Sequence, residues 1–502
     1  MTFTFDLINS PWVPCILPSG GIRELGLRNA LAQAHDLREV HGESPLVTAA
    51  LYRLLLAVLH RVFGPADYDK WGALWEAGGW DTGRLDAYLE KWRSRFDLFA
   101  TERPFYQAAD ARVKPKSVIN LVHEVASGNN ATLFDHHTEE GGMALTPAAA
   151  ARAVVTTQSF GLAGLSGLDQ KFTDGTCARG VLFLAQGKTL FETLALNLLR
   201  YPGDDAALPC RGDDCPAWEM TDPYAPERSL PRGYLDYLTW QSRRILLLPE
   251  ASANSVVVRQ MTTAPALRLD STVLDPMKHY VKRDEELAML RFSEERALWR
   301  DSAALFRLRS EGWRPPLVFD HLGSLIEEGY LERSQTLRYL ALGMANDQGR
   351  VFFFRSERMP LPLAYLRNRG LVDALNSGEM LAENVARQLW GAVRTLATYV
   401  LSPGYDGDEK HRPVREDLDA LTDSWAVERG YWPRLELPFL RLVQDLTADE
   451  VEPLEEWAQT LQRTAWTTFE QIAGNLEMST RALRATVQAR EQLAMGLGKV
   501  CP

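Results

Sequence analysis

Hydrophobic and polar residues follow two different periods along the first part of the chain. Alternation over residues 5–17, followed by a turn rich in Pro and Gly, predicts a strand pair. The run 46–63 is strongly apolar at helical spacing and predicts a helix. Thr146 and Pro147 are typical of an N-cap and a first helical position, so an Ala-rich helix is expected from there to about residue 157.

The middle of the chain predicts short strands with few helices between them. A continuous apolar run at 180–184 predicts a strand, and a helix is expected over 190–199. The stretch 234–248 predicts a strand pair or a kinked strand. Two further short strands are expected over 256–258 and 266–269, the second with Arg268 alternating with apolar neighbours.

A helix over 316–328 leads to two β-rich runs that flank Asn346-Asp347-Gln348-Gly349. Asn and Asp tolerate the backbone of a tight turn and Gly supplies a left-handed position, so these four residues predict a hairpin turn. Gln348 is the unusual member, because its side chain is long, flat and able both to donate and to accept hydrogen bonds. It is either a solvated turn residue or a planar side chain that contacts or parts a partner, and the local pattern leaves both open.

From about residue 364 the chain is helical to its end. Apolar stripes at helical spacing cover 381–396, 454–469 and 483–497, and a helix near 418–425 or 435–446 completes a four-helix bundle. The sequence therefore predicts an α+β protein. A large mixed domain with short antiparallel strands and helices is expected over residues 1–363, and the C-terminal four-helix bundle over 364–502.

Two segments of the first domain lack a secondary-structure pattern. Residues 124–142 have no period and little apolar content except Leu133 and Phe134, and a loop this long is usually functional or disordered. The Ala-rich helix runs into glycines at 161, 164 and 167. No strand precedes them and no Gly-Lys-Ser/Thr follows, so a nucleotide-binding loop is a weak interpretation. Close approach of the backbone to a ligand or partner is the better one.

Composition and charge narrow the functional classes. The 502 residues have a net charge of −11, which argues against a free-standing nucleic-acid binder but not against a subunit that meets nucleic acid through a small face. Neither a signal peptide nor a membrane-spanning run is visible, so a soluble cytoplasmic protein is expected. The five cysteines form no disulfide framework, and Cys210 and Cys215 make only half of a zinc site. No metal is expected.

Catalytic motifs are missing from the sequence. It contains no Gly-x-Ser-x-Gly elbow, His-Glu-x-x-His pair or P-loop, and its acid pairs fall in loops without a positioned partner. We therefore expect a binding or assembly protein with no catalytic residues and no cofactor. An uncharacterised hydrolase is the weaker alternative.

Several landmarks, taken in order along the whole chain, resemble the CasA family, which supplies the large subunit of the type I-E CRISPR surveillance complex, Cascade. The landmarks include the glycine loop that follows the Ala-rich helix and the C-terminal bundle. The residues that carry the resemblance are Asn9-Ser10-Pro11-Trp12-Val13-Pro14, Arg53-Leu54-Leu55-Leu56-Ala57, Pro104-Phe105-Tyr106-Gln107, Asn346-Asp347-Gln348-Gly349 and Tyr431-Trp432.

The resemblance implies a non-catalytic subunit for antiviral defence that recognises the protospacer-adjacent motif in double-stranded DNA. Such a subunit helps to start strand separation and recruits the helicase–nuclease, while the guide RNA reads the target sequence. Gln348 matches the family's glutamine wedge, and Asn346, Asp347 and Gly349 stand beside it. Asp347 departs from the family's usual Asn, and a carboxylate cannot donate to acceptors in the minor groove.

Other residues gain expected roles in the same way. Gly161 and Gly164 match a glycine loop that lies against the minor groove, and Arg268 falls near a basic motif-reading residue. Leu133, Phe134 and Asp135, within the loop 129–142, match the anchor to the crRNA 5′ handle and the backbone subunit that holds it. The resemblance implies other Cascade subunits as partners and no membrane. A purely architectural subunit that docks on the handle is the alternative.

Overall fold

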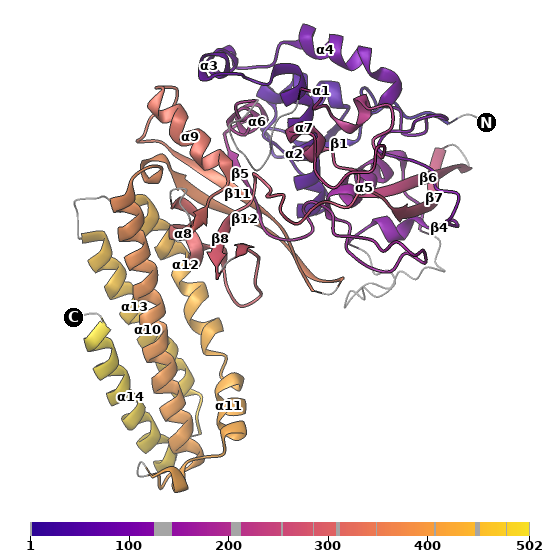
Figure 1. Cartoon of the computed structure of the whole chain (residues 1–502). Coiled ribbons are helices and arrows are strands. Elements are labelled where there is room, and N and C mark those ends of the chain that lie inside the picture. The colour runs from indigo at the N-terminus through magenta and orange to yellow at the C-terminus, as the bar shows by residue number, and fades with distance from the viewer. Residues whose placement is uncertain are drawn as a thin grey trace. The chain divides into compact units, whose positions relative to one another are not determined.

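A computed structural model gives the fold of most of the chain (Figure 1). The residues that it describes are 3–124, 143–201, 212–252, 255–284, 286–307, 312–347, 349–405, 408–446, 452–477 and 479–500. Gln348 and the loop 129–142 with Leu133, Phe134 and Asp135 lie outside the described residues.

The chain forms two compact units. The first comprises Met1–Ser293, Arg309–Arg333 and Leu337–Arg358, and the second comprises Glu294–Leu308, Ser334–Thr336 and Met359–Pro502. The boundary expected from the sequence, between residues 363 and 364, falls at the short 3-10 turn Leu363–Tyr365, just before the first long helix of the second unit. The second unit also takes in two earlier segments, so the chain crosses between the units more than once.

The first unit mixes helices with short strands. Its helices are α1 (Leu27–Ala32), α2 (Pro45–Phe63), α3 (Tyr68–Ala77), α4 (Thr82–Lys91), α5 (Pro147–Phe160), α6 (Leu190–Leu196), α7 (Tyr234–Leu238) and α9 (Leu317–Glu327). Its strands up to residue 314 are β1 (Val13–Ile16), β2 (Ile22–Leu25), β3 (Glu39–Val40), β4 (Lys116–Ser117), β5 (Leu182–Gln186), β6 (Arg243–Ser252), β7 (Ser255–Pro265), β8 (Tyr280–Arg283), β9 (Glu286–Met289) and β10 (Trp313–Arg314).

The strands assemble into small antiparallel sheets, as the sequence predicts. Their orders are β2-β1-β3, β10-β8-β9, β4-β7-β6 and β12-β11-β5, where β11 is Thr336–Asp347 and β12 is Arg350–Pro362. Within the last sheet Leu340 of β11 pairs with Leu184 of β5, so the hairpin β11–β12 extends from a buried strand of the first unit.

Helix α2 is the centre of the first unit's core. Its N-cap is Ser44, whose side chain accepts the N–H of Val47, and Pro45 occupies its first turn. The helix is long and apolar enough to cross a membrane by length and composition, but 89% of its apolar window is buried inside the protein. It is therefore a core helix, and the helix expected over residues 46–63 is confirmed.

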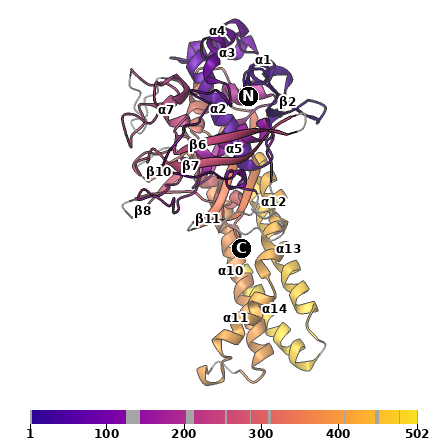
Figure 2. The same cartoon turned by 90° about the vertical axis from the view of Figure 1, so that its right-hand side faces the viewer.

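Helix α5 lies beside the strands β6 and β7 (Figures 1 and 2). Thr146 caps it by accepting the N–H of Ala149, as the sequence predicts. Near its C-terminal end the buried Gln158 uses both halves of its amide: Oε1 accepts the N–H of Arg243 at 2.9 Å, and Nε2 donates to the carbonyl of Arg243 at 2.8 Å. This pairing fixes the end of α5, where the glycine loop begins, against the start of β6.

The strand expected over 234–248 is confirmed only for residues 243–248, which lie in β6. Residues 234–238 form α7, not a strand, because the buried carboxylate of Asp214 accepts the N–H groups of Leu235 and Asp236 at 3.0 and 2.9 Å and so satisfies the first turn of a helix. The strand expected over 266–269 is absent, since β7 ends at Pro265 and the four residues after it run outside any strand.

The second unit contains α8 (Ser302–Phe306), α10 (Arg369–Leu401), α11 (Arg415–Ser424), α12 (Val427–Asp445), α13 (Glu452–Gly474) and α14 (Thr480–Val500). The four long helices α10, α12, α13 and α14 run alongside one another in Figure 1, which confirms the predicted bundle. Both candidate helices for the remaining position are present, as α11 and α12. The indole of Trp457 on α13 donates to the carbonyl of Gly378 on α10 at 2.9 Å.

Candidate nucleic-acid interface

The hairpin tip lies against the glycine loop, defined here as residues 161–173. A Cβ atom placed on Gly349 would stand 3.2 Å from the carbonyl oxygen of Ala163, and Gly349 also has a left-handed backbone with φ of +78°. Glycine is therefore favoured at position 349 for two reasons. Any other residue would strain the left-handed backbone, and its Cβ would press on the carbonyl of Ala163. Two elements that the sequence singled out separately, 186 residues apart, are neighbours in the structure.

Asn346 and Asp347 differ in whether their side chains are free to bind a partner. The amide of Asn346 donates to the carbonyl of Ala178 at 2.6 Å and is half-buried, so it holds the hairpin onto the first unit. Asp347 is exposed, and its side chain makes no hydrogen bond or ion pair with the described residues. A carboxylate can only accept, so Asp347 offers a free acceptor at the tip.

The glycine loop is a closed structure with a fixed root. Gly164 and Phe172 exchange both backbone hydrogen bonds, at 3.2 and 3.0 Å. At the root the N–H of Gly175 donates to the carbonyl of Gly161 at 2.7 Å. Leu165 lies at the tip of the loop, beyond these hydrogen-bonded pairs, and is 83% exposed.

Gly161 and Gly164, which the sequence grouped together, have different surroundings. Gly161 is buried, and a Cβ there would meet the carbonyl oxygen of Thr157 at 2.7 Å and Nη2 of Arg243 at 3.0 Å. Gly164 is exposed, and a Cβ there would meet nothing within 4 Å. Of the two, only Gly164 presents open backbone to a ligand.

Arg243 closes the root of the loop, although no pattern in the sequence singles it out. Its Nη2 donates to the carbonyls of Leu162 and Thr173 at 2.9 and 2.6 Å, which joins the two arms of the loop. The guanidinium also lies 4.8 Å from the ring centroid of Phe172. Burial lowers the pKa of Arg243 to about 10, and the charge of Asp174 opposes that shift. At neutral pH it remains a cation held between carbonyls.

Residues 174–179, called here the hub loop, bond to both the glycine loop and the hairpin. Oδ1 of Asp174 accepts the N–H of Ala163 from the glycine loop at 2.8 Å, and the carbonyl of Ala178 accepts the amide of Asn346 from the hairpin. The hub loop is itself held from below by Lys278, whose Nζ donates to the carbonyl of Thr176 at 2.7 Å. The relative placement of hairpin and glycine loop therefore depends on this loop.

The charges beneath the hub loop are deeply buried. Arg53 and Asp275, each 1% exposed, are joined by a hydrogen bond of 3.0 Å from Nη1 to Oδ2, and Lys278 lies 4.0 Å from the same carboxylate. Burial alone would raise the pKa of Asp275, but the two cations hold it below its ordinary value. Burial lowers the pKa of Lys278, which the charge of Asp275 opposes.

Arg268 belongs to a third segment near the glycine loop. Nε2 of Gln170 donates to the carbonyl of Ala266 at 3.2 Å, which ties the segment after β7 to the loop. Arg268, two residues further on, is exposed and makes no hydrogen bond or ion pair with the described residues. After the hydrogen bonds from Thr272, the charge of Arg268 helps to lower the pKa of Asp270, and the guanidinium itself remains exposed.

A metal centre is not evident in the part of the chain that the structure describes, where no three His, Cys, Asp or Glu side chains gather in a suitable group. Cys15, Cys177 and Cys215 carry free thiols, and burial raises the pKa of each. Cys210 and Cys501 lie outside the described residues.

Comparison with known proteins finds similarity over nearly the whole chain. The model of the CRISPR-associated protein Cse1 family matches residues 6–468. The CRISPR-associated protein CasA/Cse1 of Thermus thermophilus is 34% identical over 516 residues, which cover 99% of this chain and 98% of that protein. The crystal structure of T. thermophilus CasA superposes with a TM-score of 0.81 at 30% identity, covering 99% of this chain and 100% of that one.

A chain of a CRISPR RNA-guided surveillance complex shares the fold, with a TM-score of 0.77 at 24% identity and coverage of 98% of this chain and 99% of that one. The family match and the identity to the T. thermophilus protein both extend over the glycine loop and the hairpin that meets it. On that evidence the chain belongs to the CRISPR-associated protein Cse1 (CasA) family.

Proposed function

We propose that this chain is the large, non-catalytic subunit of a CRISPR RNA-guided surveillance complex and that it recognises the protospacer-adjacent motif in double-stranded DNA. The single observation that supports this most is the contact between the hairpin tip and the glycine loop, where Gly349 approaches the carbonyl of Ala163. Gly164, which has open space around it, lies in the same loop. Arg268 follows a segment that is hydrogen-bonded to that loop.

This combination suits the minor groove of DNA. The groove is about 6 Å wide, so a protein that reads it needs narrow elements such as glycine backbone or a hairpin tip. Arg side chains are attracted to its negative potential. We assign Gln348 as the residue that enters beneath the motif to help start strand separation. Asp347 and Gly349 stand beside it, and Asp347 can only accept, which in this groove means accepting from the amino group of guanine.

The remaining parts of the proposal concern the assembly. Leu133, Phe134 and Asp135 would anchor the chain to the crRNA 5′ handle and to the subunit that holds it. Once DNA is bound, the complex would recruit the helicase–nuclease that degrades the target. We place this activity in the cytoplasm, without a cofactor and without catalytic residues in this chain.

Binding of duplexes with and without the motif by the reconstituted complex tests the proposal. We expect the wild-type complex to prefer the motif duplex, and Gln348→Ala to remove most of that preference while the complex still assembles. If Gln348→Ala discriminates between the duplexes as well as wild type, motif recognition by this hairpin is wrong.

The alternative is a purely architectural subunit, which the loop 129–142 favours because its apolar pair suits docking on another subunit. Deleting this loop should abolish co-purification with the complex, and intact assembly would count against the docking role. Both roles can hold together. Motif discrimination by the wild-type complex separates them, because an architectural subunit gives none.

A further inference from the structure

A cavity of about 420 Å³ opens in the first unit, outside the surface described above. Its floor is aromatic, formed by Phe105, Tyr106 and Trp218, whose rings lie against one another. Its rim carries three arginines, Arg95, Arg103 and Arg244. The proposed contacts of the hairpin and the glycine loop do not use this cavity.

Nearby carboxylates compensate the rim arginines only in part. The charge of Arg244 acts on Asp110, whose ion-pair partner is Arg112. Arg95, Arg103 and Arg244 form no ion pair with the described residues, although Glu102 and Asp222 also line the cavity. Burial and the nearby charge of Arg103 lower the pKa of Arg95, and Glu102 opposes that shift. Like charges held this close make the rim favourable for an added anion.

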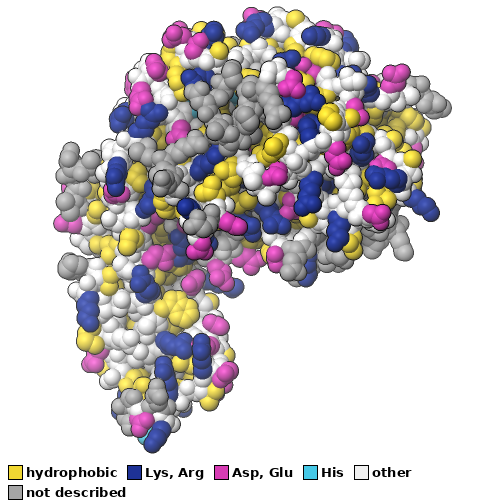
Figure 3. Space-filling model, in the orientation of Figure 1, with side chains coloured by type: hydrophobic (Ala, Val, Ile, Leu, Met, Phe, Trp, Pro, Cys, Tyr) yellow, Lys and Arg dark blue, Asp and Glu magenta, His cyan; other side chains and the backbone are white. Residues whose placement is uncertain are grey.

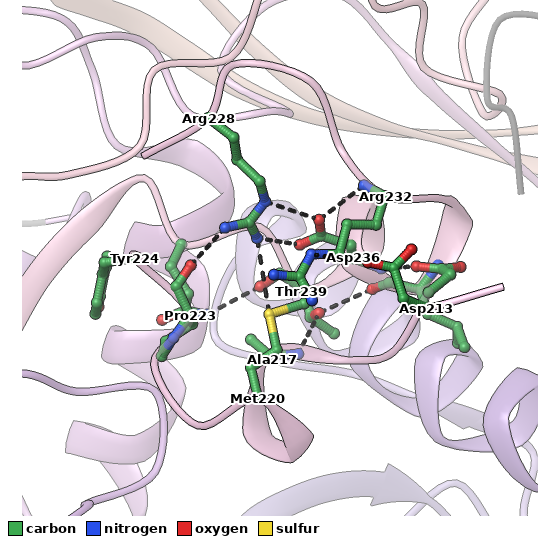
Figure 4. Close-up of polar contacts among 12 residues, drawn as sticks. Asp213, Ala217, Met220, Pro223, Tyr224, Arg228, Arg232, Asp236 and Thr239 are labelled. Atoms are coloured by element: carbon green, nitrogen blue, oxygen red, sulfur yellow. Dashed lines mark hydrogen bonds and ion pairs between the residues drawn. The ribbon is translucent and has the colours of Figure 1, made fainter. Parts of the chain in front are cut away.

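The walls of the cavity are rigidly built. Figure 4 shows Arg228 bridging from Asp236 to the segment that forms one wall: Nη2 donates to Oδ1 of Asp236 at 2.7 Å, and Nη1 to the carbonyl of Pro223 at 2.8 Å. On the same segment the N–H of Ala217 donates to the hydroxyl of Thr239 at 2.9 Å. Arg244 is held in turn by the ring of Tyr224, whose centroid lies 4.2 Å away.

The cavity continues towards the glycine loop. A smaller hollow of about 110 Å³ shares Arg244 and Tyr224 with it and is also lined by Gln170 and Ala266. Gln170 belongs to the glycine loop, and its hydrogen bond to Ala266 leads to Arg268. A path through the two hollows therefore begins beside the glycine loop and is lined by Arg244, Arg103 and Arg95. Arg268 lines neither hollow, and Arg112, Glu102, Asp222 and Glu227 also lie on the path.

The general charge of the surface does not explain this path. On the face drawn in Figure 3, Lys and Arg side chains are interspersed with Asp and Glu, and the chain as a whole carries −11. Contact with a polyanion must therefore be local. In duplex DNA each strand presents a phosphate about every 3.4 Å along the axis, so a strand held at the motif offers further phosphates to neighbouring cations.

We propose that the arginine-rimmed cavity binds backbone phosphates of the target DNA next to the motif. This rests on the proposed function, because the path starts beside the glycine loop. The contact is independent of sequence. It adds affinity to every duplex that the complex holds and leaves the choice between motifs to the hairpin and the glycine loop.

Salt titration of duplex binding by the reconstituted complex tests this. Replacing both Arg95 and Arg103 with Gln should reduce the magnitude of the slope of log K against log salt by about 1 to 2, at roughly 0.9 per lost phosphate contact. Affinity should fall for motif and non-motif duplexes alike, with their ratio unchanged. Arg103→Glu is a second variant at an exposed side chain, where a folding defect is not expected.

Arg93→Gln is the matched control. Arg93 is in the same 3-10 turn as Arg95, but it pairs with Glu90 and Asp6 and does not line the cavity, so the slope should stay at the wild-type value. A wild-type slope in the double variant would overturn the proposal. Loss of crRNA from the complex with unchanged DNA binding would also overturn the proposal, because the cavity would then be an RNA site. Absence of motif preference in wild type would instead refute the proposed function.

Discussion

The glycine loop has a root and a tip that use the same residue type for different reasons. At the root, Gly161 is enclosed by the carbonyl of Thr157 and the guanidinium of Arg243, so glycine is needed for packing. At the tip, Gly164 faces open space, and nothing in the described structure requires glycine there. Changes at the root therefore act through the fold, whereas changes at the tip act through a partner.

Arg243→Met at the root should have the largest effect on stability. It removes the donor to the carbonyls of Leu162 and Thr173, and each buried carbonyl left without a partner costs about 1–3 kcal/mol. We expect the free energy of unfolding to fall by roughly 2–4 kcal/mol, measured by denaturant titration of the isolated chain. A loss below about 0.5 kcal/mol would show that the root does not depend on this side chain.

Gly349→Ala, where the hairpin meets the loop, should have an intermediate effect. A non-glycine residue in a left-handed backbone costs about 1–2 kcal/mol, and the new Cβ would press on the carbonyl of Ala163. The free energy of unfolding should drop by about that amount, and motif discrimination should weaken with it. Gly78→Ala is a matched control, because it has a similar φ of +65° but open space around it, so it should reproduce the strain and leave discrimination unchanged.

Lys278→Met beneath the hub loop should lower the free energy of unfolding by about 1 kcal/mol, because the carbonyl of Thr176 left without its donor costs about 1–3 kcal/mol and relief of the buried charge offsets part of that cost. Removing a buried cation relieves a desolvation penalty, while Asp275 keeps its bond to Arg53. The hub loop, however, loses the bond to the carbonyl of Thr176. We expect weaker motif discrimination with unchanged binding of non-motif duplex. Full discrimination in this variant would mean that the hub loop is positioned without Lys278.

The sequence predicted those parts of the fold that local periods determine. Helices α2 and α5 and the hairpin β11–β12 follow from apolar spacing, an N-cap and turn residues, each visible within a short stretch of the chain. Helix α7 was mistaken for a strand because its first turn is satisfied by Asp214, a contact that no local pattern shows.

The candidate surface was predicted only as separate pieces. Glycines and a hairpin tip could be singled out by residue type, but their contact at Gly349 and Ala163 is a property of the fold. In the sequence Arg243 is only a basic residue at the start of a strand. Its role depends on hydrogen bonds to carbonyls 81 and 70 positions away. Gly161 is buried and Gly164 is exposed, a difference that their spacing in the sequence does not reveal.

The most direct test of the account is motif discrimination by a complex that carries Gly164→Phe. Open space around Gly164 predicts an unchanged free energy of unfolding, and Gly212→Phe, at another exposed glycine with nothing within 4 Å, serves as the matched control. We predict that Gly164→Phe lowers affinity for the motif duplex at least tenfold, about 1.4 kcal/mol, while Gly212→Phe binds as wild type. Equal affinity of the two variants for the motif duplex would contradict it.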